Sequence, residues 1–95
     1  MVDLEFEWDD AKNSANIVKH GVGFVLARNV FKDVFAIERL DDRLDYGEER
    51  YVIIGMAEGR LLSVVYAIRG DDVVRIISAR GAAPLENRQY HEENS

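Results

Sequence analysis

The first twenty residues switch from strand-like alternation to helical spacing. Apolar and acidic residues alternate over 4–8, which is typical of a short strand with one buried face. Asp9 is placed to cap a helix and Gly21 to end it, so the sequence predicts a helix over 10–20. Spacing of i, i+4 and i+7 puts three apolar residues on one face, which we expect to pack on the sheet. They are Ala11, Ala15 and Val18, and the adjacent face carries Lys12, Asn16 and Lys19.

A second, shorter helix is predicted over residues 22–33. Apolar residues recur there with helical spacing at Phe24, Ala27 and Phe31. Residues 35–37 form a candidate strand, and the polar segment 41–49 is expected to be a loop.

Three segments rich in Val, Ile and Tyr follow, and each has the character of a strand. They cover Arg50–Gly55, Arg60–Arg69 and Val73–Arg80. Tight turns at 58–59 and 70–72 separate them, so an antiparallel meander is predicted. Both alternation phases are largely apolar, so both faces of the sheet should be covered at least in part.

The order of these elements predicts an α+β fold, because the strands cluster after the helices. Pro84 suits the first turn of a final helix, which is expected to run to about Glu92. The expected architecture is two N-terminal helices packed on an antiparallel β-meander, with a C-terminal helix, in one domain over residues 1–95.

Composition narrows the functional classes. The chain has no cysteine and two histidines, so we expect no thiolate zinc site, no histidine-rich metal centre and no cofactor. It has no run of 18 apolar residues and no cationic leader, so we expect no membrane association and a cytoplasmic location.

The charge is acidic but uneven. Twelve basic and eighteen acidic residues give a net charge of −6, so the overall field should not attract nucleic acid. Residues 50–80, however, hold five arginines against three acids. The planar guanidinium fork suits phosphate and carboxylate, so the sequence permits a local anion site on an acidic body.

Strong catalytic motifs are absent from the sequence. It contains no glycine-rich phosphate loop, no zinc-protease helix motif and no serine nucleophile elbow. His20 ends the first predicted helix, where it is either a cation favourable to the helix dipole or a proton-transfer group.

Arg75 lies within an apolar strand, so it must reach the sheet edge or find a partner. One reading is a phosphate contact. The other is an ion pair with Glu48, Glu49 or Asp45. Arg80 has the opposite alternation phase on the same strand, so a bulge or twist near Ser78 would be needed to bring both arginine heads together.

Two groups of motifs, one in each half of the chain, stand out together. The first half carries Glu7-Trp8-Asp9, Lys12, Asn16, Lys19-His20-Gly21-Val22, Phe24, Ala27, Phe31 and Asp33. The second half carries Gly47-Glu48, Arg50, Ile54-Gly55, Leu62-Ser63-Val64, Arg75-Ile76-Ile77-Ser78-Ala79-Arg80, Ala82, Glu86 and Tyr90. With these motifs, residues 5–92 resemble the BrnT toxin family.

The resemblance implies a toxin of a bacterial type II toxin–antitoxin module. Such toxins are ribonucleases with a RelE-like fold that block translation. Their partner is a BrnA-type antitoxin with a ribbon-helix-helix domain, which neutralises the toxin and represses the operon. Operator DNA would then be bound only through the antitoxin, and RNA would be the substrate.

The resemblance also selects candidate site residues for RNA cleavage without a metal, in which the 2′-hydroxyl attacks the phosphate. The expected catalytic set is Lys19, His20, Arg50, Arg80 and Tyr90. The expected RNA-binding set is Lys12, Arg75 and Arg88. Arginines would hold the phosphate, and Lys19, His20 or Tyr90 would transfer protons.

The last helix departs from the family pattern, which usually continues after Arg80 with several basic residues. Here Arg88 is the one firmly cationic residue of that stretch. Because phosphate contacts dominate affinity for nucleic acid, a second function stays open. In that alternative the chain is a weakly active or inactive toxin-fold protein that acts mainly as a partner-binding, autoregulatory module.

Overall fold

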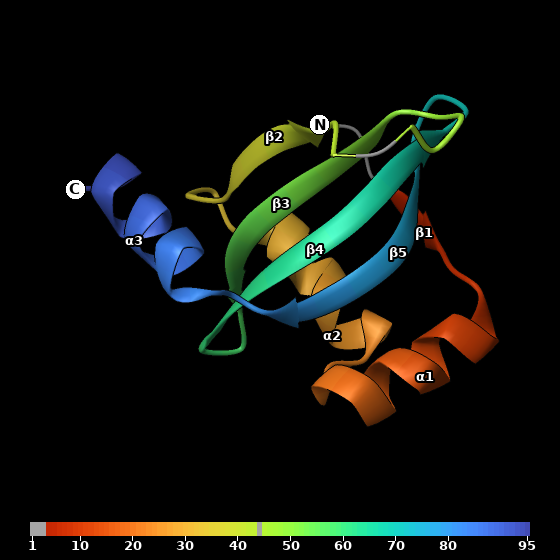
Figure 1. The fold of residues 1–95 in the computed structure, drawn as a ribbon, viewed down its shortest axis with the longest axis horizontal. Helices are drawn as coiled ribbons and strands as arrows, with labels where there is room; N and C mark the ends of the chain where they lie inside the picture. The colour runs from red at the N-terminus through yellow and green to blue at the C-terminus, as the bar shows by residue number, and fades with distance from the viewer. Residues whose placement is uncertain (1–3, 44) are drawn as a thin grey trace.

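Figure 1 shows the computed structural model of the protein, which describes residues 4–43 and 45–95. The elements in chain order are β1 (Glu5–Glu7), α1 (Asp10–His20), α2 (Phe24–Ala27), the 3₁₀ helix η1 (Arg28–Lys32), β2 (Ile37–Asp41), β3 (Arg50–Ala57), β4 (Arg60–Arg69), β5 (Val73–Gly81) and α3 (Pro84–Glu93). The α+β fold class predicted from the sequence is confirmed.

The five strands form one sheet in the order β1-β5-β4-β3-β2. The predicted meander of β3, β4 and β5 is confirmed, and β1 joins β5 in parallel. The candidate strand at 35–37 was placed too early. The Asp33 carboxylate accepts a hydrogen bond from the Phe35 amide, and the Asp33 carbonyl accepts one from the Ala36 amide. These bonds turn the chain, so strand pairing begins only at Ile37.

The short helices α2 and η1 cover one face of the sheet and build the main core with it (Figure 1). The apolar residues predicted to share one helix face do point into the core. Phe24 and Ala27 are fully buried, and Phe31 packs edge-on against Tyr66. The second predicted helix is interrupted, however, since it tightens to 3₁₀ geometry from Arg28 onward. The fully buried side chains of this core include Val22, Phe24, Val30, Leu62, Val64, Val74 and Ile76.

Helix α1 packs through a different face from the predicted one. Ala11, Ala15 and Val18 are all exposed, Val18 to 88%. The buried residue is Asn16, whose Nδ2 donates to the carbonyl of Ala79 at 2.6 Å and to that of Val22 at 2.8 Å. The Ala79 amide donates back to Asn16 Oδ1 at 3.2 Å.

The physical reason lies in the length of β1. It pairs with β5 only at Val73–Arg75, so among the described residues no strand lies beside β5 beyond that point on that side. Buried amide and carbonyl groups need partners, and the Asn16 amide supplies both at Ala79. A polar side chain therefore fixes α1 to the sheet, and the apolar spacing was misleading.

The second face of the sheet is covered only at one end, by α3 (Figure 1). Tyr90 of α3 packs in a small cluster with Val52 and Ile54, and its hydroxyl donates to the Asp33 carboxylate at 2.7 Å. The rest of this face stays open and holds the candidate site. The helices of the described residues are too short and too polar to cross a bilayer.

Candidate anion-binding site

A bulge in β5 brings residues of opposite sequence phase to one face. Ser78 pairs with Val65 and Ile76 with Tyr66, so Ile77 has no cross-strand partner. The alternation shifts by one residue at that point. Arg75 and Arg80 consequently share the open face of the sheet, since they lie opposite Ala67 and Ser63 of β4.

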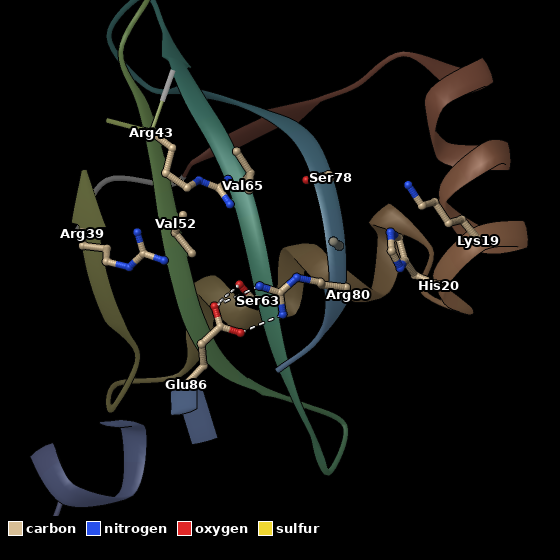
Figure 2. Close-up of a pocket in the computed structure, with 11 residues that line it drawn as sticks. Lys19, His20, Arg39, Arg43, Val52, Ser63, Val65, Ser78, Arg80 and Glu86 are labelled. Carbon is tan, nitrogen blue, oxygen red and sulfur yellow. Dashed lines mark hydrogen bonds and ion pairs between the residues drawn. The ribbon is translucent and has the colours of Figure 1, made fainter. Parts of the chain in front are cut away.

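The open face contains a hollow with a volume of about 280 Å³, shown in Figure 2. Its floor is formed by side chains of β3, β4 and β5, and its rim is basic. We call it the cationic hollow and define it by its lining residues: Lys19, His20, Arg39, Arg43, Val52, Ser63, Val65, Ser78, Ala79, Arg80 and Glu86.

Three parts of the chain supply the basic rim (Figure 2). Lys19 and His20 come from the last turn of α1, which ends at Gly21 in the left-handed conformation with φ 68°. Arg39 belongs to β2 and Arg43 follows that strand on the opposite side of the hollow, while Arg80 of β5 lies between the two groups. The Asn16 contact with β5 therefore also positions the end of α1 at the rim.

Arg43 is held in place by a carboxylate behind it. Its Nε and Nη2 donate to Asp41 at 2.7 and 2.9 Å. These bonds hold the pKa of the buried Asp41 below its usual value. The side chain of Arg43 stays largely exposed, so this cation remains accessible at the rim.

Arg80 is paired with Glu86, the one acidic residue among the described residues that line the hollow. Arg80 Nη1 donates to Oε1 at 2.7 Å and Nη2 donates to Oε2 at 3.1 Å. Glu86 also accepts hydrogen bonds from the Ser63 hydroxyl at 3.1 Å and from the Ala83 amide at 2.8 Å. Burial tends to raise the pKa of Glu86, but the bonds from Arg80 and Ala83 outweigh it and lower that pKa.

Arg50 and Arg75 lie on the same face but outside the hollow. Arg75 Nη1 donates to Glu7 at 2.6 Å. The hypothesis of a pair with Glu48, Glu49 or Asp45 is therefore wrong, because parallel pairing places Glu7 directly opposite Arg75. Arg50 stacks on the ring of Tyr46 at 4.1 Å and approaches Glu48 at 3.6 Å.

The remaining sequence candidates also lie outside the hollow. Tyr90 is buried, and burial together with the Asp33 carboxylate raises its pKa to about 12. Lys12 on α1 and Arg88 on α3 are exposed. Of the eight predicted site residues, the hollow gathers Lys19, His20 and Arg80.

Sequence reasoning did not select Arg39, Arg43 or Glu86 as site residues. Arg39 was missed because the strand was placed two residues too early, which hid its alternation with Ile37 and Asp41. Arg43 lay within a polar segment that predicted only a loop. Glu86 appears at the third position of α3, where a capping role explains it equally well.

The arrangement defines a class of protein. A hollow with four Lys or Arg side chains and one histidine on an acidic chain is suited to bind an anion, and the arginines can grip a phosphate with two donors each. Within residues 4–43 and 45–95, no cluster of three or more His, Cys, Asp or Glu side chains could hold a metal ion. The fold is that of a small α+β protein, and the cationic hollow is its candidate anion-binding site.

Comparison with known proteins gives the family. A family model described as the ribonuclease toxin BrnT of type II toxin–antitoxin systems matches residues 8–86. The protein belongs to this BrnT family, as its motifs indicated. The crystal structure of the Brucella abortus ribonuclease toxin BrnT is similar, with a TM-score of 0.64 and 25% identity over 85% of this chain and 99% of that chain. No curated protein sequence matches significantly.

Proposed function

We propose that the protein cleaves RNA at the cationic hollow by a metal-independent reaction and thereby inhibits translation. The observation that carries the proposal is the basic rim itself, in which Lys19, His20 and Arg80 meet Arg39 and Arg43 over an open sheet face. Family membership supports ribonuclease activity, and the residue chemistry supports the route.

In the proposed reaction the 2′-hydroxyl of a bound nucleotide attacks the adjacent phosphate. Arg39, Arg43 and Arg80 hold the phosphate and stabilise the charge of the phosphorane. Lys19 and His20 lie across the hollow from Arg39 and Arg43 (Figure 2), where one takes a proton and the other returns one to the leaving 5′-oxygen.

The candidates outside the hollow have a lesser part in this proposal. Arg75, Lys12 and Arg88 are assigned to the RNA backbone beyond the reacting phosphate. Arg50 and Tyr90 would act on the substrate only after leaving Tyr46 and Asp33, their present contacts.

The proposed partner is a BrnA-type antitoxin with a ribbon-helix-helix domain. Type II modules pair a protein toxin with a protein antitoxin, so family membership supports an antitoxin in general. Its type, its repression of the operon and binding of operator DNA through it alone are part of the proposal.

The partner-binding alternative is favoured by a separate observation. Arg75, Arg80 and Arg43 are each paired with a carboxylate, and the net charge is −6. This neutralisation weakens attraction for RNA, and a chain with weak cleavage would act chiefly by binding its antitoxin.

Induction in a bacterial host tests the two functions. The ribonuclease proposal expects growth arrest that coexpression of the adjacent gene relieves, together with cleavage of RNA by the purified chain in EDTA. Cleavage that requires added metal would contradict the mechanism. Stable copurification with the adjacent gene product, without arrest or cleavage, would establish the partner-binding function instead.

A further inference from the structure

Glu86 has no capacity left for chemistry of its own. A carboxylate offers about four lone-pair sites, and Glu86 receives four hydrogen bonds. Oε1 accepts from Arg80 Nη1 and the Ala83 amide, and Oε2 accepts from Arg80 Nη2 and the Ser63 hydroxyl. The residue is 7% exposed and its pKa is lowered, so it stays ionised and saturated.

The pairing uses only one edge of the Arg80 guanidinium. Glu86 engages the end formed by Nη1 and Nη2, and the second hydrogen of Nη1 reaches the Gly81 carbonyl at 3.0 Å. The Nε hydrogen and the second Nη2 hydrogen have no partner within residues 4–43 and 45–95. These two hydrogens lie parallel on the adjacent edge, which is the other geometry in which arginine binds a phosphate with two bonds.

That free edge faces the open part of the hollow. In Figure 2 Glu86 and Ser63 lie on one side of the Arg80 head, and Nε is turned away from them. A long side chain without such a support would sample several rotamers. Here the support comes from three elements, since Ser63 belongs to β4, Arg80 to β5 and Glu86 to α3.

The geometry points to Glu86 as the positioning residue of the site, which fixes Arg80 so that its Nε and Nη2 edge binds the reacting phosphate with two hydrogen bonds. This inference rests on the proposed function for its effect on cleavage. It assigns α3 a part in the reaction through its first turn, which explains why a carboxylate lines an otherwise cationic hollow.

Glu86 could act on Arg80 by positioning it or simply by offsetting its charge. These two roles predict opposite effects on the cleavage rate when the charge of Glu86 is removed. If Glu86 only offsets the charge of Arg80, the substitution Glu86→Gln strengthens RNA binding and speeds cleavage together. If Glu86 positions Arg80, the same substitution leaves RNA binding equal or tighter, because an acid is lost from a cationic site. The rate of cleavage at saturation then falls, because the phosphate contact is misaligned.

The first experiment measures KM and kcat of the full chain with a short single-stranded RNA. For Glu86→Gln we expect kcat to fall between about 10- and 100-fold with KM unchanged or lower. Glu92→Gln is the matched control, since it removes the same charge from an exposed position of α3, and it should match the wild type. In the Arg80→Ala background, Glu86→Gln should lower kcat no further. An unchanged or higher kcat for Glu86→Gln overturns the inference.

A second measurement does not depend on ribonuclease activity or on the stability of one variant. The ¹⁵N–¹H signal of Arg80 Nε is followed by NMR while inorganic phosphate is added to the wild type and to Ser63→Ala, which loses one of the four bonds. We expect a sharp signal that phosphate shifts in the wild type, and a broader, less responsive one in the variant. A wild-type signal indifferent to phosphate overturns the inference even if RNA is cleaved. A responsive signal without cleavage in the wild type contradicts the proposed function alone.

Discussion

Asn16 and Ala79 lie 63 residues apart in the chain and are joined by two hydrogen bonds, one in each direction. The side-chain amide continues the hydrogen bonding of β5 where β1 has ended. The same contact sets the position of Lys19 and His20, which lie one turn further along α1 at the rim of the cationic hollow.

Replacing Asn16 with alanine should destabilise the protein by about 2–3 kcal/mol, because buried groups of Ala79 and Val22 lose their partner. Urea denaturation measures the change. Asn87→Ala, at an exposed position of α3, is the control and should stay within about 0.5 kcal/mol. Equal stability of the two variants would show that α1 is held by other contacts.

Replacing Arg80 with alanine should slow RNA cleavage roughly 10- to 150-fold, the equivalent of a lost charge-assisted bond of about 1.5–3 kcal/mol. The fold should survive, because Glu86 keeps its hydrogen bonds from the Ser63 hydroxyl and the Ala83 amide. Circular dichroism checks the fold, and Arg28→Ala, an exposed change on η1, should cleave normally. Wild-type cleavage by Arg80→Ala would remove this residue from the site.

Replacing Tyr90 with phenylalanine should cost about 1 kcal/mol at neutral pH, because one hydrogen bond to Asp33 is lost. Burial and Asp33 raise the pKa of Tyr90 to about 12, against about 10 in the unfolded chain. The tyrosine contribution is therefore complete below pH 10 and declines as the pH rises to 12. Denaturation at several pH values should show the difference between wild type and Tyr90→Phe shrinking in that window, and a constant difference would contradict this linkage.

Replacing Gly55 with alanine should destabilise the protein by about 1–3 kcal/mol through overpacking. A Cβ at this position would lie 2.9 Å from Val30 Cγ1, 3.0 Å from Ala36 Cβ and 3.2 Å from Asp33 Oδ2. Gly81→Ala is the control, because, apart from its two chain neighbours, no described residue has a heavy atom within 4 Å of a Cβ there. The midpoint of thermal unfolding should be lower for Gly55→Ala than for Gly81→Ala. Similar midpoints would mean that the neighbours of Gly55 move aside at little cost.

Local signals in the sequence were sufficient for most of the fold. Asp9 caps α1 by accepting a hydrogen bond from the Lys12 amide at 3.0 Å, and Gly21 ends it, as the residue types predicted. The meander followed from β-branched runs between turns. The packing face of α1 could not be predicted from local signals. It depends on the residue at which β1 ends, and strand pairing determines that residue.

The candidate site was predicted less completely because it is assembled from distant segments. Lys19, His20 and Arg80 were selected, but Arg39 and Arg43 reach the same hollow only through the order of strands in the sheet. The shared face of Arg75 and Arg80 depends on the unpaired Ile77, and a bulge is not visible in a hydrophobicity pattern. The residue types in the sequence indicated an anion site. Where that site lies in the molecule could be found only from the tertiary structure.

Under the proposed function, the small number of cations at the hollow limits how strongly the affinity for RNA depends on ionic strength. Each phosphate neutralised on a single strand contributes about −0.7 to the slope of log affinity against log salt. Lys19, Arg39, Arg43 and Arg80 together set a ceiling near −3 for contacts made in the hollow. Because the Debye length is about 10 Å at 0.1 M, the acidic body repels RNA that approaches elsewhere only at short range. Under the proposed function, orientation at the hollow, rather than overall attraction, therefore governs which phosphate is held.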